Sequence, residues 1–204
     1  MAIILEGRRS PFDHRLMRAM FEARKSVFVD LLKWDVPVVD GRYEIDQFDD
    51  DFATYVIVTD HEGRHLGSAR LLQTMRPHIL DTLFPNLCAD RPPRGAGIFE
   101  ITRFCLDRDQ HATDRRIARN RLVSAMVDYA IDQGIHAFTG VAEHNWLQQV
   151  LDFGWRCKPL GQPREIGGRK LGAIRIEVEE NTPALLAWNN IYAPDMLQCA
   201  LEAA

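Results

Sequence analysis

The sequence has little of what several protein classes require. Its formal net charge is −4, from 25 lysines and arginines against 29 acids. Nucleic-acid-binding domains normally carry a strong basic excess, so no nucleic-acid partner is expected. The apolar run at the N-terminus ends at Leu5, too early for a signal peptide or a membrane span. We therefore expect a cytoplasmic protein without stable membrane insertion.

Signatures of metal and nucleotide binding are also missing. The four cysteines are far apart and form no CxxC pair: Cys88, Cys105, Cys157 and Cys199. This spacing favours buried, reduced thiols over disulfides or a metal site, and a glycine between His61 and His65 argues against a metal pair there. There is no GxGxxG after a first strand, no GxxxxGK[ST] and no GxSxG. These absences argue against a dinucleotide-binding Rossmann unit, a P-loop and a serine-hydrolase elbow.

The patterns that are present alternate between strand and helix. A chain of 204 residues, 46% apolar and 26% charged, suits one globular domain, which we expect over residues 1–204. The patterns predict strands at 2–6, 55–59, 66–72, 98–106, 137–142 and 172–178, and helices at 11–32, 114–133, 145–153, 182–190 and the C-terminal end. Residues 76–87 are expected to form a short helix followed by a turn at Pro85. Loops are expected at 33–52 and 161–170. This order predicts an α/β fold with a central mixed sheet flanked by helices.

Charged and aromatic side chains are crowded into residues 24–49. Arg24 falls within the apolar stripe of the first predicted helix, whose other members are Met17, Phe21, Phe28 and Leu31. Trp34 ends that helix, and three acids lie in the polar segment beyond it: Glu44, Asp46 and Asp49. Because a buried charge is costly unless it is paired, this stretch predicts a binding site. The alternative for Arg24 is an arginine that snorkels at the helix edge.

Three more charged residues stand inside predicted strands. Arg70 needs a partner, and the acids of the preceding loop are candidates. Glu100 and Arg103 lie in the run IFEITRFCL, where regular alternation would point them to opposite faces of the sheet. If both serve one site, the strand must bulge or splay between them. Otherwise one belongs to the site and the other to a structural ion pair.

The helix predicted at 114–133 begins with four arginines: Arg115, Arg116, Arg119 and Arg121. Positive charge at a helix N-terminus opposes the macrodipole, so a nearby anion such as phosphate would relieve it. The alternative is a solvated basic face.

Taken in order, these residues resemble the acyl-homoserine lactone synthases, the bacterial autoinducer synthases of quorum sensing. The matching features lie within residues 20–105: Arg24, Phe28 and Trp34; Gly41-x-x-Glu44-x-Asp46-x-x-Asp49; Gly67-Ser-Ala-Arg70-Leu-Leu; Pro77; Phe84-Pro85; and FEITRF around Glu100 and Arg103. The C-terminal half is similar mainly in layout, with the helix at 114–133 and the motif FGW at 153–155.

The resemblance implies a GNAT-like acyltransferase fold whose sheet splays to form an acyl-donor cleft. It implies transfer of an acyl group from a thioester to the amine of S-adenosylmethionine, then lactonisation that releases methylthioadenosine. S-adenosylmethionine is a substrate rather than a cofactor, and the donor is carried on acyl carrier protein or on coenzyme A. The N-terminal half would hold S-adenosylmethionine, and the C-terminal half the acyl chain and its carrier.

One departure bears on the donor. GNAT acetyltransferases bind the pyrophosphate of coenzyme A with a Q/RxxGxG/A turn, and the corresponding stretch here, Arg115–Asn120, has no glycine. This difference favours a phosphopantetheine arm and leaves coenzyme A open.

The resemblance implies a catalytic set of five residues: Arg24, Asp46, Asp49, Glu100 and Arg103. Glu100 is the expected general base, because burial in an apolar strand raises the pKa of a carboxyl group. The alternative is a structural ion pair with Arg70 or Arg103. Asp46 and Asp49 would hold the ammonium and balance the sulfonium. Arg24 and Arg103 would orient the carboxylate or lock the two acids by bidentate pairing.

Other residues are expected to complete the S-adenosylmethionine site. Phe28 and Trp34 would cover it and offer aromatic faces to the sulfonium, with plain hydrophobic core as the alternative. Glu44 and Arg70 are expected to form structural ion pairs. A backbone N–H of the splayed sheet would stabilise the oxyanion.

Two larger sets concern the acyl donor. The expected acyl pocket comprises Leu122, Met126, Phe138, Thr139, Gly140, Trp146, Leu147 and Leu151. In the family a threonine in this strand accompanies 3-oxo products, but Gly140 aligns at that position, so the resemblance implies neither the presence nor the absence of a 3-oxo group. Acyl carrier proteins are acidic, and a basic docking patch is expected from Arg115, Arg116, Arg119, Arg156 and Lys158.

Two other functions remain open from the sequence. One is a GNAT-like N-acyltransferase that uses acyl-coenzyme A without forming a lactone. The other is a non-catalytic protein that binds S-adenosylmethionine or an acyl ligand.

Overall fold

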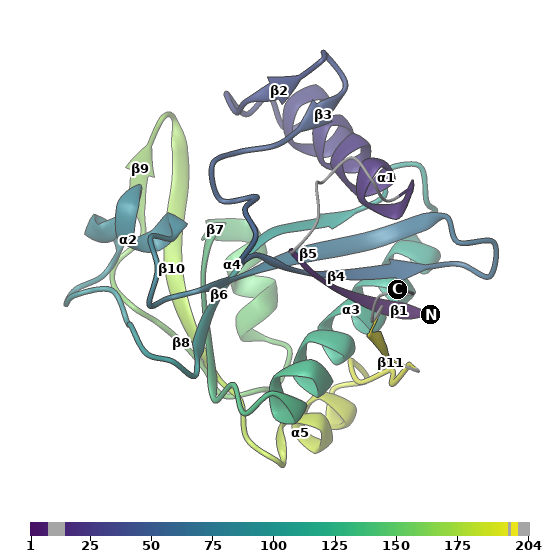
Figure 1. The fold of residues 1–204 in the computed structure, drawn as a ribbon. Coiled ribbons are helices and arrows are strands. Elements are labelled where there is room, and N and C mark those ends of the chain that lie inside the picture. Colours follow the sequence, from purple (N-terminus) through teal and green to yellow (C-terminus); the bar gives the residue numbers. More distant parts are fainter. Residues whose placement is uncertain (8–14, 196, 200–204) are drawn as a thin grey trace. The chain divides into compact units, whose positions relative to one another are not determined.

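The computed structural model describes residues 1–7, 15–195 and 197–199 (Figure 1), so residues 11–14 of the first predicted helix lie outside the described residues. The helices are α1 (Arg15–Arg24), the π-helix η1 (Lys25–Leu31), α2 (Ile79–Thr82), the 3₁₀-helix η2 (Pro85–Leu87), α3 (Ala112–Asp132), α4 (His144–Leu151) and α5 (Thr182–Trp188). The strands are β1 (Ala2–Glu6), β2 (Val38–Val39), β3 (Tyr43–Glu44), β4 (Thr54–Thr59), β5 (His65–Gln73), β6 (Ile98–Leu106), β7 (Ala137–Glu143), β8 (Cys157–Pro159), β9 (Arg164–Ile166), β10 (Arg169–Glu177) and β11 (Leu197–Cys199). None of the described helices has the length and apolar character that a membrane crossing requires.

The sheet is mixed, as predicted. Among the described residues its strands follow the order β11-β1-β4-β5-β6-β7-β10-β8, with β9 paired to β10, and β2 and β3 form a separate two-stranded sheet. β1 runs antiparallel to β4 and β7 antiparallel to β10, whereas β6 runs parallel to β7. A parallel pair needs a crossover connection, and α3 supplies it. The sequence pattern strand-helix-strand at 98–142 is therefore a βαβ unit.

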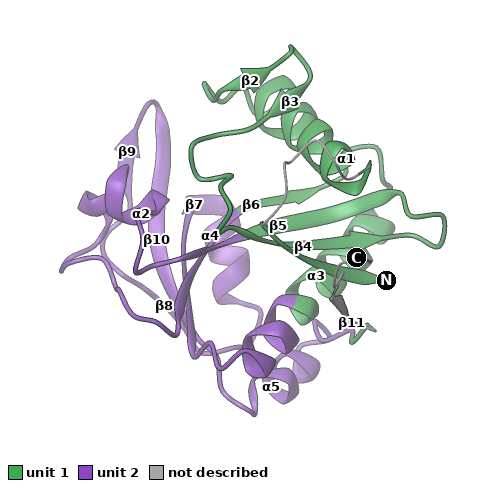
Figure 2. Cartoon of the chain, viewed as in Figure 1, with its two compact units in different colours: residues 1–70, 103–125, 194–204 green, residues 71–102, 126–193 purple. Residues whose placement is uncertain are grey.

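The chain divides into two compact units, which Figure 2 shows in different colours. Unit 1 comprises residues 1–70, 103–125 and 194–204, and unit 2 comprises residues 71–102 and 126–193. The chain passes from one unit to the other inside β5, β6 and α3. The charged stretch at 24–49 therefore belongs to unit 1, and Glu100 belongs to unit 2.

Strands β4 and β6 have the burial that their sequences predict. β4 reads TYVIVT and is buried at every position. β6 has the predicted bounds, and its residues alternate between buried and half-buried from Ile98 to Thr102. Strand side chains alternate between the two faces of a sheet, so Glu100 lies on the more deeply buried face of β6.

The first helix differs from the prediction because it changes type at Arg24. The Leu32 N–H donates to Val27 O at 2.9 Å and the Trp34 N–H to Phe28 O at 2.8 Å, both wider than the spacing of an α-helix. The wider turn breaks the spacing of three and four residues on which the apolar stripe was based. Phe28 is 3% exposed, but Leu31 is 53% exposed and does not belong to the core.

Three other predictions differ from the structure. The segment 161–170 is not a flexible loop: β9 and β10 form a hairpin across Gly167 and Gly168. Both glycines have positive φ, 58° and 75°, as a two-residue hairpin turn requires. The loop at 33–52 contains the β2–β3 pair, and residues 197–199 form strand β11 beside β1 rather than a last helix.

Candidate active site

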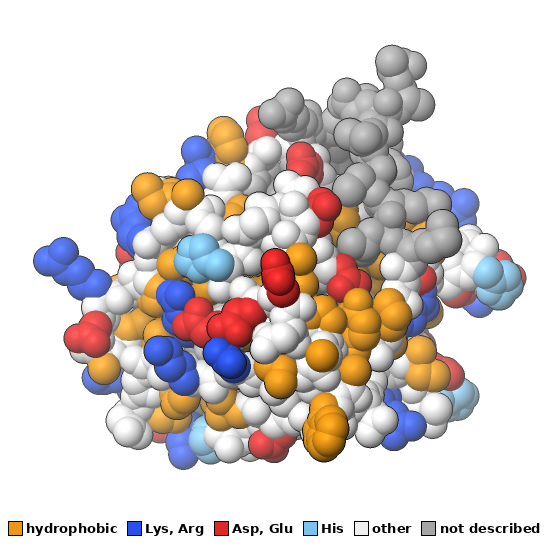
Figure 3. All heavy atoms as spheres, turned by 90° about the horizontal axis from the view of Figure 1, so that it is seen from below, with side chains coloured by type: hydrophobic (Ala, Val, Ile, Leu, Met, Phe, Trp, Pro, Cys, Tyr) orange, Lys and Arg blue, Asp and Glu red, His pale blue; other side chains and the backbone are white. Residues whose placement is uncertain are grey.

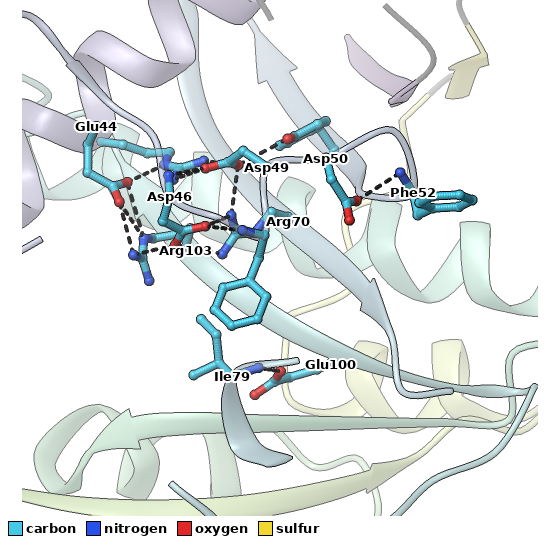
Figure 4. Close-up of polar contacts among 12 residues, drawn as sticks. Glu44, Asp46, Asp49, Asp50, Phe52, Arg70, Ile79, Glu100 and Arg103 are labelled. Atoms are coloured by element: carbon cyan, nitrogen blue, oxygen red, sulfur yellow. Dashed lines mark hydrogen bonds and ion pairs between the residues drawn. The ribbon is translucent and has the colours of Figure 1, made fainter. Parts of the chain in front are cut away.

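Six charged side chains of unit 1 form a closed ring in which arginines and acids alternate (Figure 4). Each arginine binds two acids and each acid binds two arginines. The order around the ring is Arg24, Glu44, Arg103, Asp46, Arg70 and Asp49. With three positive and three negative groups, the ring is formally neutral, and we call it the charge ring.

Arg24 makes one side of the charge ring. Its Nε lies 2.5 Å from Glu44 Oε2, and its two terminal nitrogens bind Asp49 Oδ1 and Oδ2 at 2.8 and 2.9 Å. The fork of a guanidinium matches both oxygens of a carboxylate, so this contact is directional as well as electrostatic. Arg24 is 1% exposed. It is therefore not the snorkelling arginine that the sequence left open.

Arg103 and Arg70 complete the charge ring through Asp46. Arg103 Nη2 lies 2.9 Å from Glu44 Oε1 and 2.7 Å from Asp46 Oδ2. Arg70 Nη1 lies 2.6 Å from Asp46 Oδ1 and 2.8 Å from Asp49 Oδ1. The expectation that Arg70 pairs with acids of the preceding loop is confirmed, and Glu44 forms ion pairs as predicted.

Burial and neighbouring charges act in opposite directions on the pKa values of Asp49 and Arg24. Burial alone would raise the pKa of Asp49, but the charges of Arg24 and Arg70 outweigh it and hold that pKa below its usual range. Burial would likewise lower the pKa of Arg24, whereas Asp49 and Glu44 raise it. Tyr55 adds a hydrogen bond from its hydroxyl to Asp49 Oδ1 at 3.0 Å. Asp49 and Arg24 are therefore both ionised near neutral pH.

One edge of the charge ring is less buried than the rest. The side chains of Arg103 and Asp46 are 10% and 5% exposed, whereas those of Glu44, Asp49 and Arg70 are 0% exposed. Phe28 and Trp34 stack beside this edge, with ring centroids 4.7 Å apart and planes 22° apart. The guanidinium carbon of Arg103 lies 5.6 Å from the Phe28 centroid and 6.0 Å from that of Trp34, within the range of a cation–π contact.

The backbone of β6 departs from a regular strand at Arg103. Its φ is 50°, in the left-handed region that side chains other than glycine seldom adopt. The alternating burial of β6 also shifts there, because Arg103 and Phe104 are both half-buried and Cys105 is buried. The strand is therefore irregular at Arg103, at the end of the stretch where a bulge or splay is expected if Glu100 and Arg103 serve one site, and strained residues of this kind concentrate at functional sites.

Glu100 has partners that the sequence did not suggest. In unit 2 its carboxylate oxygens accept hydrogen bonds from the backbone N–H groups of Ile79, at 2.8 Å, and Leu80, at 2.9 Å. These groups are the first two of α2, and the side chain is 0% exposed. Hydrogen bonds to a carboxylate favour its ionised form. No local pattern could reveal this contact, because its two sides are about twenty residues apart.

The pairing of β6 with β7 stops early. Residues Ile98–Ile101 of β6 pair with residues Ala137–Gly140 of β7, and the pairing ends there. Strand β7 continues to pair with β10 as far as Glu143. In a splayed sheet two neighbouring strands separate along part of their length. Hydrogen bonding that ends inside both strands, as it does here, is what such a separation requires. A Cβ placed on Gly140 would meet Ile101 O at 3.3 Å and nothing else within 4 Å.

The residues predicted for the acyl pocket do not all lie on one face of the sheet. Phe138 and Gly140 lie on the same face of the sheet as Gly172, by register with β10. A Cβ on Gly172 would lie 2.7 Å from Leu147 Cδ1, so α4 covers that face. Thr139 lies on the opposite face. The sequence-based prediction placed Thr139 in the same pocket as Phe138 and Gly140, although successive side chains of a strand point to opposite faces of the sheet.

The other pocket residues are divided between the units. Leu122 belongs to unit 1, and the rest belong to unit 2. Leu122 and Met126 are buried, Leu151 is half-buried, and Trp146 packs edge-to-face on Phe153 with centroids 5.9 Å apart.

The residues predicted for carrier docking have local partners. Arg115 donates to Arg108 O at 2.8 Å and Arg119 to Asn120 Oδ1 at 2.8 Å, on α3 in unit 1. In unit 2, Arg156 pairs with Glu179 at 3.0 Å and Lys158 is exposed. The face in Figure 3 shows basic, acidic and apolar side chains interspersed. Arg121 is structural, because it binds Asp195 and the Thr59 carbonyl.

The cysteines have mixed environments. Cys105 is buried, as predicted, whereas Cys88 and Cys157 are half-buried, and all three are free thiols. The side chain of Cys199 lies outside the described residues.

Known proteins share this fold. A solved N-acetyltransferase from Lactobacillus plantarum superposes with a TM-score of 0.57 at 16% identity, over 88% of this chain and 98% of that one. The likeness defines the class of fold as that of the GNAT-like acyltransferases. A CoA-dependent acyl-homoserine lactone synthase, BjaI, solved with SAM and isopentyl-CoA, has the same fold more closely, with a TM-score of 0.85 at 24% identity, over 100% and 95% of the chains.

Sequence similarity narrows the class to one family. Residues 10–185 match the autoinducer synthase family. An acyl-homoserine-lactone synthase of Ralstonia nicotianae is 34% identical over 175 residues, which are 82% of this chain and 85% of that protein. TofI, solved in a ternary complex with an inhibitor and MTA, is 31% identical with a TM-score of 0.77, over 92% and 96% of the chains. The chain belongs to the autoinducer synthase family. It is an acyl-homoserine-lactone synthase, an acyltransferase that makes quorum-sensing signals.

Proposed function

We propose that the charge ring and the Phe28–Trp34 stack bind the methionyl part of S-adenosylmethionine and that Glu100 is the general base of acyl transfer. The amine attacks the thioester carbonyl, the carbon–sulfur bond breaks, and an amide forms as the free thiol of the carrier leaves. The methionyl carboxylate then attacks the carbon beside the sulfonium, closes the lactone and releases methylthioadenosine. The observation that supports this assignment best is the less buried Arg103–Asp46 edge of an otherwise buried ring, next to two aromatic faces.

The charge ring has two tasks in this proposal. Each acid already binds two arginines, so the ring is a rigid support before any ligand arrives. Its Arg103–Asp46 edge offers one positive and one negative group, which suits the carboxylate and the ammonium of the methionyl moiety. Phe28 and Trp34 present aromatic surface to the sulfonium. Arg24, Glu44, Asp49 and Arg70 hold this edge in place.

Glu100 is suited to accept a proton. A general base must be ionised and fixed in orientation before the reaction. The N–H groups of Ile79 and Leu80, at 2.8 and 2.9 Å, fix its orientation, and hydrogen bonds of this kind favour the ionised form of a carboxylate. A structural role in holding the start of α2 is compatible with this one, so a test must separate catalysis from folding.

Acyl carrier protein is the donor that we propose. The stretch Arg115–Asn120 has no glycine where a coenzyme A cradle would need one, which supports a phosphopantetheine arm without the nucleotide. BjaI, whose fold this chain shares, is CoA-dependent, so coenzyme A is the alternative donor. Phe138, Gly140 and Leu147 are the residues of the predicted acyl pocket that occupy one face of the sheet in unit 2.

The experiment incubates the protein with S-adenosylmethionine and matched acyl-carrier and acyl-coenzyme A donors, and measures products by mass spectrometry. An acyl-homoserine lactone and methylthioadenosine in equal amounts are expected, with higher kcat/KM for the carrier-protein donor. An acylated amine without lactone would instead indicate an ordinary GNAT-like N-acyltransferase. Binding of S-adenosylmethionine without any acylated product would indicate a binding protein. Higher kcat/KM with coenzyme A donors would reverse the donor assignment alone.

A further inference from the structure

Strand β7 carries a buried hydroxyl group without a partner. Thr139 is 0% exposed, and its Oγ1 has no hydrogen-bonding partner in the protein. Most buried polar atoms in folded proteins are paired, so an unpaired one needs a specific explanation such as a bound water. No expectation from the sequence accounts for this hydroxyl, because Thr139 faces away from Phe138 and Gly140.

Thr139 stands directly beside Glu100. The register of the parallel pair β6–β7 places Glu100 opposite Thr139. Side chains at paired positions leave the sheet on the same face, from strands about 4.8 Å apart. Glu100 binds two backbone N–H groups of α2, and a carboxylate offers about four acceptor positions. The carboxylate and the unpaired hydroxyl are therefore neighbours on one face.

Apolar side chains cover part of this face of the sheet, and Arg175 of β10 lies in register with Thr139 on the side away from Glu100. Leu80 of α2 forms a buried cluster with Leu87 and Ala173, and Val141 packs against the cluster. Val141 lies two positions from Thr139 on the same face of β7, in register with Ala173. A polar group enclosed in this way interacts strongly with any partner it has, because the surroundings are of low dielectric constant.

We propose that Thr139 positions a water molecule against Glu100 and that this water carries the substrate's proton to the carboxylate. The proposal rests on the assignment of Glu100 as the base. The N–H bond of the attacking nitrogen breaks as an O–H bond forms on the water, and the water passes one of its own protons to Glu100. No oxidant, reductant or further reactant is needed. A bound water would supply the hydrogen-bonding partner that the buried Thr139 hydroxyl lacks in the protein. Thr139 is thus a positioning residue.

The test compares three variants of the full chain. Thr139→Val removes the hydroxyl with little change of shape, and Thr139→Ser keeps it. Thr59→Val is the matched control, because Thr59 Oγ1 is also buried and unpaired but lies on β4, which does not pair with β6. Positioned proton transfer contributes about 100-fold or more to a rate. We expect Thr139→Val to lower kcat by at least about tenfold with unchanged KM for S-adenosylmethionine, and Thr139→Ser and Thr59→Val to keep kcat near that of the wild type.

A high-resolution crystal structure of the wild type tests the water itself. Density for a water within hydrogen-bonding distance of both Thr139 Oγ1 and Glu100 is expected. Its absence overturns the proposal, even if Thr139→Val does not fold. A wild-type kcat in Thr139→Val, or an equal loss in Thr59→Val, also overturns it. Failure of the wild type to make any lactone would instead contradict the proposed function, which separates the two failures.

Discussion

Arg24 and Asp49, separated by 25 positions in the chain, are joined by two hydrogen bonds of 2.8 and 2.9 Å inside unit 1. Both side chains are almost completely buried, at 1% and 0% exposed. Paired charges in such a place contribute more to a defined geometry than to stability, whereas removing one partner leaves the other buried and unpaired. The charge ring is therefore expected to tolerate loss of a member poorly.

Arg24→Met tests this dependence. The change leaves Glu44 and Asp49 each without one arginine, and a loss of about 3–5 kcal/mol in the free energy of unfolding is expected. Urea denaturation measures it. Arg42→Met is the control, because Arg42 pairs with Glu22 on the surface, where the side chains are 65% and 37% exposed, and a change within about 1 kcal/mol is expected there. Equal effects of the two substitutions would show that burial of the ring has no energetic consequence.

Acid should weaken the fold through Asp49. The pKa of Asp49 lies below its usual range in the folded protein, because the charges of Arg24 and Arg70 outweigh the effect of burial. The stabilisation is therefore complete above the unfolded-state pKa of about 3.9 and is lost as the pH falls from there towards the folded-state pKa. Urea midpoints measured from pH 7 to pH 2 should fall less steeply below pH 4 in Asp49→Asn than in the wild type. Parallel curves would contradict the assignment.

A buried histidine should weaken the fold at milder pH. Burial lowers the pKa of His65 to about 4, and its Nε2 lies 2.9 Å from Ser68 Oγ. Because the unfolded chain takes up this proton near pH 6.5, stability that is complete above pH 6.5 falls as the pH decreases to about 4, by on the order of 3 kcal/mol. The wild type should lose more stability than His65→Gln over this range. His61→Gln, at an exposed side chain, should follow the wild type.

Removing the aromatic stack beside the ring should weaken substrate binding. Trp34 stacks on Phe28 and lies 6.0 Å from the guanidinium of Arg103. If its face contacts the sulfonium, Trp34→Leu should raise the KM for S-adenosylmethionine about 2- to 30-fold. Steady-state kinetics with one acyl donor at saturation measures this. A lower kcat with unchanged KM would place Trp34 outside the S-adenosylmethionine site.

The sequence predicted the parts of the fold that depend on local pattern. β6 has its predicted bounds, and α3 was predicted within two residues at each end. The hairpin at Gly167–Gly168 also had a local signal, because two adjacent glycines between strand-like runs favour a tight turn. The π-helix after Arg24 had none, since its residues fit an α-helix equally well, and the exposure of Leu31 followed from it.

The sequence predicted which charged residues belong to the candidate site, but not which of them bind one another. Its charged residues stood out because arginines and acids occurred in apolar stretches. Which acid binds which arginine depends on contacts between residues 20 to 59 positions apart, and no local pattern specifies these. The two N–H groups on Glu100 and the unpaired hydroxyl of Thr139 became visible only once α2 and the β6–β7 register were known.

Glu100→Gln tests the central claim most directly. The substitution keeps the size of the side chain and removes its charge, and product formation from S-adenosylmethionine and an acyl donor is followed by mass spectrometry, with a thermal melt as the check on folding. A variant that remains folded and forms lactone at least about 100-fold more slowly than the wild type is expected, since this is the usual contribution of a general base. A folded Glu100→Gln variant with wild-type kcat would contradict the assignment of Glu100 as the base.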